Sequence, residues 1–150
     1  MDKYHSIISK DPQETSAMGE KIATSLKREG KSSNVICLYG ELGSGKTTFV
    51  QGFARGLGIS ARLLSPTYII VRRYSIPNVS GFLYHMDLYR LLPSVALSDL
   101  GIQEILQDKE SYVVIEWAEK LGDLLPDKRT DMYFSVSGDG YHHIKIEPHI

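Results

Sequence analysis

The feature that most constrains this chain is a glycine-rich segment, Gly40-Glu41-Leu42-Gly43-Ser44-Gly45-Lys46-Thr47. It fits the pattern G-x-x-x-x-G-K-[ST] of phosphate-binding loops. Glycine permits backbone angles that let successive N–H groups point at phosphate oxygens. In such a loop the lysine contacts the β- and γ-phosphates, and the last hydroxyl group binds Mg²⁺. The segment therefore predicts a nucleotide phosphate site at Lys46 and a metal ligand at Thr47.

The sequence on either side of this segment has the pattern that a phosphate-binding loop needs. Residues 34–39 form an almost unbroken apolar run, which predicts a buried strand. Residues 48–57 carry apolar side chains at helical spacing, and Gly56 and Gly58 are typical of a helix end. Such a helix directs the positive end of its dipole at a bound anion. A strand, a loop and a helix in this order favour nucleotide binding over a glycine-rich turn that binds nothing.

The composition limits the fold and the class of protein. With 150 residues, 42% hydrophobic and 23% charged, the chain suits one soluble domain with a substantial core. Its net charge of −1 favours neither a nucleic-acid coat nor a membrane surface, so any RNA contact needs a local patch or a partner. The single cysteine, Cys37, cannot form an internal disulfide, and we expect it to be buried. The N-terminus lacks a signal-peptide core and no run spans a bilayer, so we expect a cytoplasmic protein.

The remaining segments alternate between helical and strand patterns. The expected elements are an edge strand at 6–9, a helix from Asp11 to Gly30, a hairpin of 68–74 and 82–88, a helical stretch at 95–106 broken near Gly101, a strand at 112–117, a short helix around 121–125, and a C-terminal hairpin of 131–136 and 142–146. At the first helix, Asp11 and Glu14 form a capping-box pattern. We predict one α/β domain over residues 1–150, a three-layer P-loop NTPase fold with helices on both faces of the sheet. Its sheet is expected to be mixed and mostly parallel, with antiparallel strands at the C-terminal end.

Two acidic residues follow strand patterns and are candidates for the chemistry. Glu116 ends the apolar run Val113-Val114-Ile115, where these folds place a metal-binding acid. That acid is usually Asp, and the longer Glu side chain reaches Mg²⁺ directly or through water. Asp87 ends the strand at 82–88 and is placed to orient or deprotonate an attacking water. The alternatives are a plain strand-end carboxylate for Glu116 and a turn-forming residue for Asp87.

Other candidates have a structural alternative that the pattern does not separate from function. Thr67 is either a sensor of the γ-phosphate or an ordinary strand-start threonine. Trp117, the only tryptophan, belongs either to the core or to a ligand contact. His85 is expected to be structural, and the C-terminal histidines lack metal-ligand spacing.

Four motifs occur together in the chain, and their combination is far more specific than the phosphate-binding loop alone. They are Gly-Glu-Leu-Gly-Ser-Gly-Lys-Thr-Thr-Phe from Gly40, Ser65-Pro66-Thr67-Tyr68, His85-Met86-Asp87-Leu88-Tyr89-Arg90-Leu91, and Ile115-Glu116-Trp117. With these motifs the chain resembles the TsaE (YjeE) family, the small ATPase of bacterial tRNA threonylcarbamoyladenosine synthesis. The resemblance extends from Asp11 to the C-terminal strands.

The resemblance implies an activity and a partner. Members of the family bind and hydrolyse ATP with Mg²⁺, weakly when alone. They support a TsaD–TsaB pair, which transfers a threonylcarbamoyl group to adenosine 37 of tRNAs that read ANN codons. The ATPase does not perform that transfer, so tRNA is expected to be an indirect partner, reached through the complex.

The resemblance also implies roles for individual residues. Lys46, Asp87 and Thr67 are expected near the γ-phosphate, and Thr47 and Glu116 at Mg²⁺. The expected nucleotide-binding residues are Glu41, Leu42, Gly43, Ser44, Gly45, Lys46, Thr47, Thr48, Trp117 and Thr15. The chain departs from the family at Ala118, where proline is usual, and at Tyr141, where an arginine often contacts the nucleotide. Tyrosine can stack on a base but carries no positive charge.

Two other functions use the same loop and stay open. A small-molecule kinase would need an acceptor pocket and usually an arginine-bearing lid, and no segment has an obvious lid pattern. A non-catalytic nucleotide switch would not need Asp87 and Glu116 for chemistry. A guanine-specific GTPase is disfavoured because the sequence has no Asn-Lys-x-Asp motif.

Overall fold

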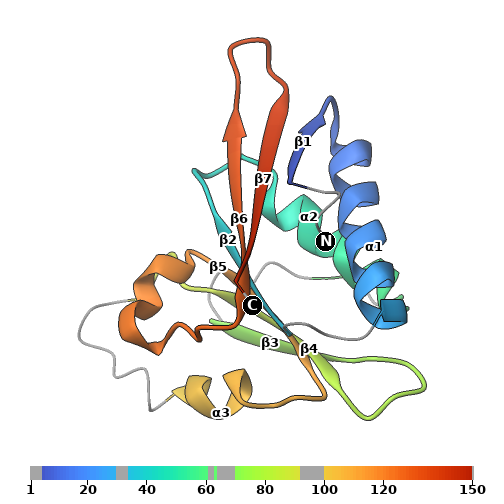
Figure 1. Cartoon of the computed structure of the whole chain (residues 1–150), viewed down its shortest axis with the longest axis vertical. Coiled ribbons are helices and arrows are strands. Elements are labelled where there is room, and N and C mark those ends of the chain that lie inside the picture. Colours follow the sequence, from blue (N-terminus) through green and yellow to red (C-terminus); the bar gives the residue numbers. More distant parts are fainter. Residues whose placement is uncertain (1–4, 30–33, 61–62, 64–69, 92–99, 150) are drawn as a thin grey trace.

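One seven-stranded sheet with helices on both faces forms the described part of the chain (Figure 1). The computed structural model describes residues 5–29, 34–60, 63, 70–91 and 100–149. The elements in chain order are β1 (Ser6–Ser9), α1 (Pro12–Glu29), β2 (Val35–Tyr39), α2 (Lys46–Gly56), β3 (Val71–Ser75), β4 (Phe82–Asp87), α3 (Ile102–Leu106), β5 (Tyr112–Glu116), the 3₁₀ helix η3 (Ala118–Leu124), β6 (Arg129–Val136) and β7 (His142–His149).

The strands lie in the order β1-β7-β6-β2-β5-β4-β3. The four central strands β6, β2, β5 and β4 are mutually parallel, while β7, β1 and β3 are added by antiparallel pairing. The sheet is mixed, as predicted, but three of its six described pairings are antiparallel. The central strands are parallel, as predicted, and antiparallel strands extend both ends of the sheet. At one end β3 forms a hairpin with β4. At the other end β7 forms a hairpin with β6, and β1 pairs with β7.

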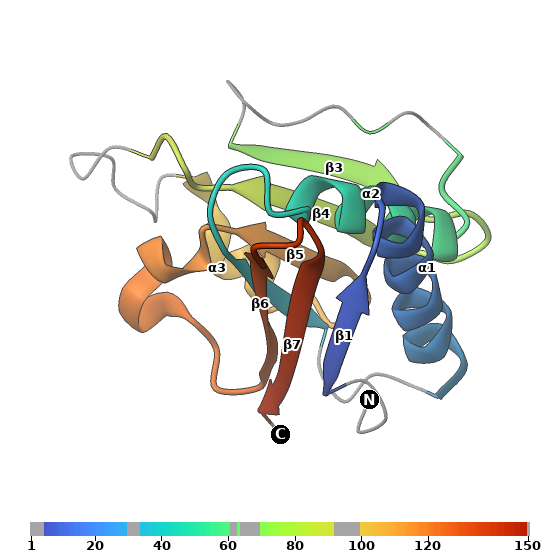
Figure 2. The same ribbon diagram turned by 90° about the horizontal axis from the view of Figure 1, so that it is seen from above.

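Alternate residues of the central strands face two separate cores. Ile36 and Leu38 of β2 pack with α1 and α2, whereas Val35 and Cys37 pack on the other face with α3 and η3. This is the alternation that a strand buried on both faces requires. Figures 1 and 2 show α1 and α2 side by side on one face, with α3 and η3 on the other. The three layers and the burial of Cys37 are confirmed.

Helices α1 and α2 approach until their backbones touch. A Cβ atom on Gly52 of α2 would overlap the carbonyl oxygen of Ser16, and one on Gly19 of α1 would overlap that of Phe49. Only glycine permits this approach. Since α2 begins at the phosphate-binding loop, the contact fixes the loop against α1.

The predictions for the starts of α1 and α3 can be compared with the structure in detail. Asp11 caps α1 by accepting a hydrogen bond from the Glu14 N–H at 2.8 Å. The Glu14 carboxylate, however, accepts from the Lys10 N–H at 2.8 Å instead of closing the box on Asp11. Gly101 has φ 68° and α3 begins directly after it, so the second half of the predicted helical stretch is present; residues 95–99 lie outside the described part.

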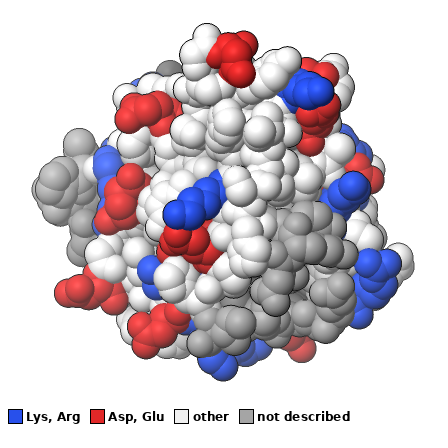
Figure 3. Space-filling view, turned by 45° about the horizontal axis from the view of Figure 1, so that its top comes forward, with Lys and Arg blue, Asp and Glu red and all other residues white. Residues whose placement is uncertain are grey.

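Two further properties bear on possible partners. Among the described residues, no helix is both long and apolar enough to span a bilayer. Figure 3 shows acidic and basic side chains interspersed on the displayed face, without one large field of either sign. This mixed face agrees with the net charge of −1.

Candidate functional site

The loop between β2 and α2 has the backbone that the glycine pattern predicts. Gly43 and Gly45 have φ angles of 79° and 106°, in the region that favours glycine, and Gly45 is the N-cap of α2. The Ser44 hydroxyl is buried and has no hydrogen-bond partner within the described residues. The first N–H groups of a helix also lack partners within it. The loop therefore offers donors suited to an anion.

Lys46 lies at the base of the loop, with only 4% of the residue exposed. Its ammonium group donates a hydrogen bond to the Gly40 carbonyl oxygen and lies 4.1 Å from the centre of the Trp117 ring. Burial lowers the pKa of Lys46, while the charges of Glu116 and Asp87 act in the opposite direction. The Gly40 carbonyl oxygen, the Trp117 ring and the two nearby carboxylates thus stabilise the charged form of Lys46 beside the phosphate-binding loop.

Thr47 and Glu116 meet at the carboxyl ends of the parallel strands. The Thr47 hydroxyl lies 3.3 Å from Oε1 and 3.5 Å from Oε2 of Glu116, which is buried at the end of β5. No cluster of three or more His, Cys, Asp or Glu side chains that could hold a metal occurs in the described ranges. Mg²⁺ commonly binds through one or two protein oxygens, with phosphates and waters completing the shell. The pair fits a metal that enters together with a nucleotide.

Asp87 lies beside Glu116, since the two residues are register partners on β4 and β5. Its Oδ1 accepts a hydrogen bond of 3.0 Å from the Tyr89 N–H. Burial raises the pKa of Asp87, and the nearby Glu116 charge also raises it, whereas the Tyr89 bond lowers it. A carboxylate with a raised pKa is a stronger proton acceptor than an exposed one.

These groups surround one cavity of about 500 Å³. It is lined by Pro12, Thr15, Leu42, Gly43, Gly45, Lys46, Thr47, Thr48, Asp87, Tyr89, Arg90, Glu116, Trp117 and His142. Small-molecule sites range from roughly 300 to 1,000 Å³, so this cavity is large enough for a nucleotide.

The structure brings most of the predicted site residues to this cavity, though not all. Glu41 is exposed and Ser44, although it belongs to the loop, is buried, and neither residue lines the cavity. Thr67 lies outside the described residues. Tyr141, in the position of the family's arginine, is also absent from the described lining.

Trp117 belongs to the cavity as well as to the second core. It has φ 58°, a backbone conformation uncommon for a large side chain, and its ring lies 5.0 Å from that of Tyr89. Thr15, near the start of α1, also lines the cavity and shares a hydrogen bond of 2.6 Å with the Ser9 hydroxyl. Trp117 therefore joins the end of β5 to the Asp87-Leu88-Tyr89 turn.

Two histidines at the site were not predicted from the sequence as functional. His142 lines the cavity, and its Nδ1 lies 2.7 Å from the Ser44 carbonyl oxygen, to which it must donate. His85 is buried on β4, as expected of a structural residue, but its Nε2 lies 2.6 Å from Oε2 of Glu116. Neither contact follows from sequence spacing, because each depends on which strands lie beside β2 and β5.

Comparison with known proteins identifies the family. A model described as "Threonylcarbamoyl adenosine biosynthesis protein TsaE" matches residues 9–144. The chain belongs to the TsaE family. Membership confirms the assignment made from the four motifs, and the matched range covers the described cavity residues from both the N- and C-terminal parts of the chain.

Individual members of this family are similar to the chain over most of its length. The tRNA threonylcarbamoyladenosine biosynthesis protein TsaE of Bacillus subtilis is 36% identical over 129 residues, covering 86% of this chain and 76% of that protein. The protein of the same name from Treponema pallidum is 35% identical over 139 residues, covering 93% and 97%. The crystal structure of Bacillus subtilis YdiB matches with a TM-score of 0.77 and 30% identity, over 97% of this chain and 85% of that one. The chain therefore shares its fold with a solved structure.

Proposed function

We propose that this protein is a Mg²⁺-dependent ATP hydrolase of the P-loop NTPase class. Its turnover would support a TsaD–TsaB-like pair in forming N6-threonylcarbamoyladenosine at position 37 of tRNAs that read ANN codons. The observation that carries the proposal is the gathering of the phosphate-binding loop, the Thr47–Glu116 pair and Asp87 around one cavity. Family membership supplies the pathway.

Each group has a role that its position supports. The N–H groups of the loop and the ammonium group of Lys46 bind the phosphates, and Thr15 and Trp117 contribute to the lining around the nucleotide. Thr47 and Glu116 hold Mg²⁺, which when bound neutralises charge on the phosphates. Asp87 orients a water molecule toward the γ-phosphate and accepts its proton, a role that suits its raised pKa.

The partner assignment rests on the family and on the net charge. The relatives' name places them in tRNA threonylcarbamoyladenosine biosynthesis. The net charge of −1 provides no overall attraction to nucleic acid, and affinity for nucleic acid depends largely on basic charge. We therefore propose that the protein acts on the TsaD–TsaB-like pair and reaches tRNA through that complex.

Calorimetric titration with ATP tests the binding site. We predict that the wild type binds ATP and that Lys46→Ala abolishes the measurable binding, because the variant removes the cation at the base of the loop. A matched control is Lys145→Ala, which removes an exposed lysine from β7, away from the cavity. Undiminished ATP binding by Lys46→Ala would overturn the site assignment.

A further inference from the structure

The Glu116 carboxylate is contacted on both of its oxygens. His85 Nε2 lies 2.6 Å from Oε2, and the Thr47 hydroxyl lies nearer to Oε1, at 3.3 Å. The His85 and Glu116 side chains are 1% and 4% exposed, so water competes little for this bond. An ionised carboxylate only accepts hydrogen bonds, and Nε2 of His85 must therefore be the donor. The bond fixes which oxygen of Glu116 stays available on the Thr47 side.

The alternation of β4 explains why His85 and Asp87 are two residues apart. Successive strand side chains point to opposite faces, so residues 85 and 87 share a face. On the neighbouring strand β5, Val114 and Glu116 are their register partners. His85 can thus contact the Glu116 carboxylate without lining the cavity, while Asp87 lines the cavity itself. In the His-x-Asp spacing, the histidine therefore contacts Glu116 and the aspartate faces the cavity.

Glutamate at this position creates a need for such a contact. It has one more rotatable bond than aspartate, and an unrestrained carboxylate would spread over several rotamers. Hydrogen bonds to carboxylate ligands orient them toward a metal, and their loss typically lowers metal affinity about 10- to 100-fold. His85 provides this restraint, because its bond to Oε2 leaves Oε1 beside Thr47.

We propose that His85 is a positioning residue, which fixes the Glu116 carboxylate for the Mg²⁺ ion that binds with the nucleotide phosphates. The inference rests on the proposed function, since it concerns the metal of that same site. It assigns His85 no contact with the nucleotide. Its removal should therefore weaken the effect of Mg²⁺ on nucleotide binding and leave metal-free binding intact.

Calorimetric titration with ADP, once in excess Mg²⁺ and once in EDTA, measures this without requiring hydrolysis. The quantity compared is the factor by which Mg²⁺ strengthens ADP binding. We expect His85→Phe, which keeps the ring volume but has no donor, to reduce this factor about tenfold or more. Its affinity for ADP in EDTA should stay within about twofold of the wild type. Tyr84→Phe, at the preceding residue of β4, is the control and should change neither quantity.

Two amide variants separate positioning from packing. The side-chain nitrogen of glutamine can take the place of Nε2, whereas that of asparagine is nearer to the place of Nδ1. We expect His85→Gln to retain most of the Mg²⁺ effect and His85→Asn to lose it. This comparison also decides the matter if His85→Phe does not fold.

The possible failures are distinguishable. An unchanged Mg²⁺ factor in His85→Phe, or equal factors in the glutamine and asparagine variants, would overturn the role of His85 while leaving the nucleotide site in place. A wild type that binds ADP but gains nothing from Mg²⁺ would overturn the metal assignment and this inference with it. A wild type that binds no ADP in either condition would overturn the proposed function itself.

Discussion

Lys46, Glu116 and Asp87 show how single residues set the chemistry of the cavity. The lysine is buried, which alone would favour its neutral form, but two acids nearby favour the cation. Asp87 has a raised pKa because it is partly buried beside Glu116. The same three side chains thus place one ammonium group and two carboxyl groups around one cavity of about 500 Å³.

Replacing Asp87 should separate binding from turnover. We predict that Asp87→Ala binds ATP within about threefold of the wild type but loses at least about 100-fold in hydrolysis rate, the usual contribution of a general base. Calorimetry measures the first quantity and phosphate release the second. Full activity in this variant would remove Asp87 from the mechanism.

Cys37 should make the folded protein sensitive to alkaline pH. Burial raises the pKa of its thiol from 9.0 to about 12. The folded state therefore keeps the proton that the unfolded chain loses above pH 9, and the free energy of unfolding falls as the pH rises from 9 toward 12, by at most about 1.4 kcal/mol per pH unit for this group. Urea unfolding at pH 8 and pH 10.5 measures the fall. A fall equally steep in Cys37→Ala would show that the thiol is not its source.

At the scale of the elements, the contact between α1 and α2 links the stability of the fold to the shape of the cavity. The two helices touch at Gly19 and Gly52, and α2 begins with the Lys46 and Thr47 of the cavity. Thr15, near the start of α1, lines the same cavity. Separation of the helices would therefore displace lining residues that come from both helices.

A single methyl group should be enough to show this link. We predict that Gly52→Ala destabilises the protein by about 1–3 kcal/mol or more, because the added Cβ would overlap the Ser16 carbonyl oxygen. It should also weaken ATP binding, as measured by calorimetry. The control is Gly138→Ala, where a Cβ would have no neighbour within 4 Å among the described residues. Equal stability of the two variants would contradict the close helix contact.

The elements also show how far sequence could predict the structure. The strand, loop and helix around Lys46 follow from local patterns, and Glu116 could be placed because parallel strands end at one edge. The contacts of His85 and His142 could not be predicted, since they depend on β4 lying beside β5 and on the β6–β7 hairpin lying beside β2. A hairpin can be predicted from local sequence, but the strand of the sheet beside which it pairs depends on the whole fold.

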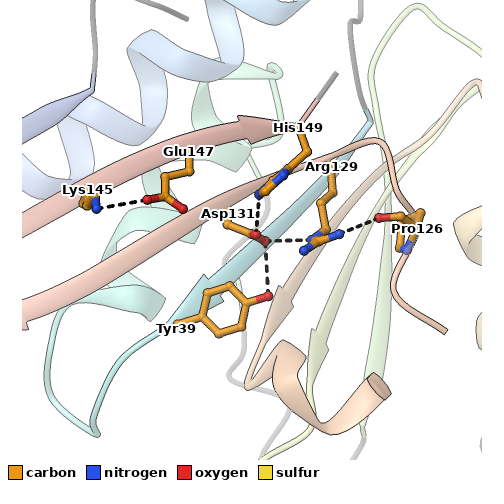
Figure 4. Close-up of polar contacts among 7 residues, drawn as sticks. All are labelled: Tyr39, Pro126, Arg129, Asp131, Lys145, Glu147 and His149. Carbon is orange, nitrogen blue, oxygen red and sulfur yellow. Dashed lines mark hydrogen bonds and ion pairs between the residues drawn. The ribbon is translucent and has the colours of Figure 1, made fainter. Parts of the chain in front are cut away.

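At the scale of the whole molecule, a buried carboxylate joins three strands of the sheet. Asp131 of β6 is 2% exposed and contacts Tyr39 of β2 at 3.1 Å, Arg129 at 3.0 Å and His149 of β7 at 2.9 Å (Figure 4). Arg129 also donates to the Pro126 carbonyl oxygen, just before β6. The cluster attaches the C-terminal hairpin to the strand that leads into the phosphate-binding loop.

Loss of Asp131 should therefore destabilise the molecule as a whole. We predict that Asp131→Ala lowers the free energy of unfolding by about 2 kcal/mol, less than for a fully buried pair because Arg129 and His149 are partly exposed. Urea unfolding measures the change. Glu147→Ala, on the exposed Lys145–Glu147 pair of the same face, is the control and should leave the unfolding midpoint unchanged. Comparable losses in both variants would contradict a special role for the buried carboxylate.

The proposed partner-dependent ATPase activity is tested most directly by the rate of ATP hydrolysis by the purified protein, alone and with the TsaD–TsaB pair from the same cell. We predict slow hydrolysis by the protein alone, strong stimulation by the pair, and loss of the stimulated activity in Asp87→Ala. Equal rates with and without the pair would contradict partner dependence. That result would leave a generic ATPase or a small-molecule kinase, which a screen for phosphorylated metabolites would then distinguish.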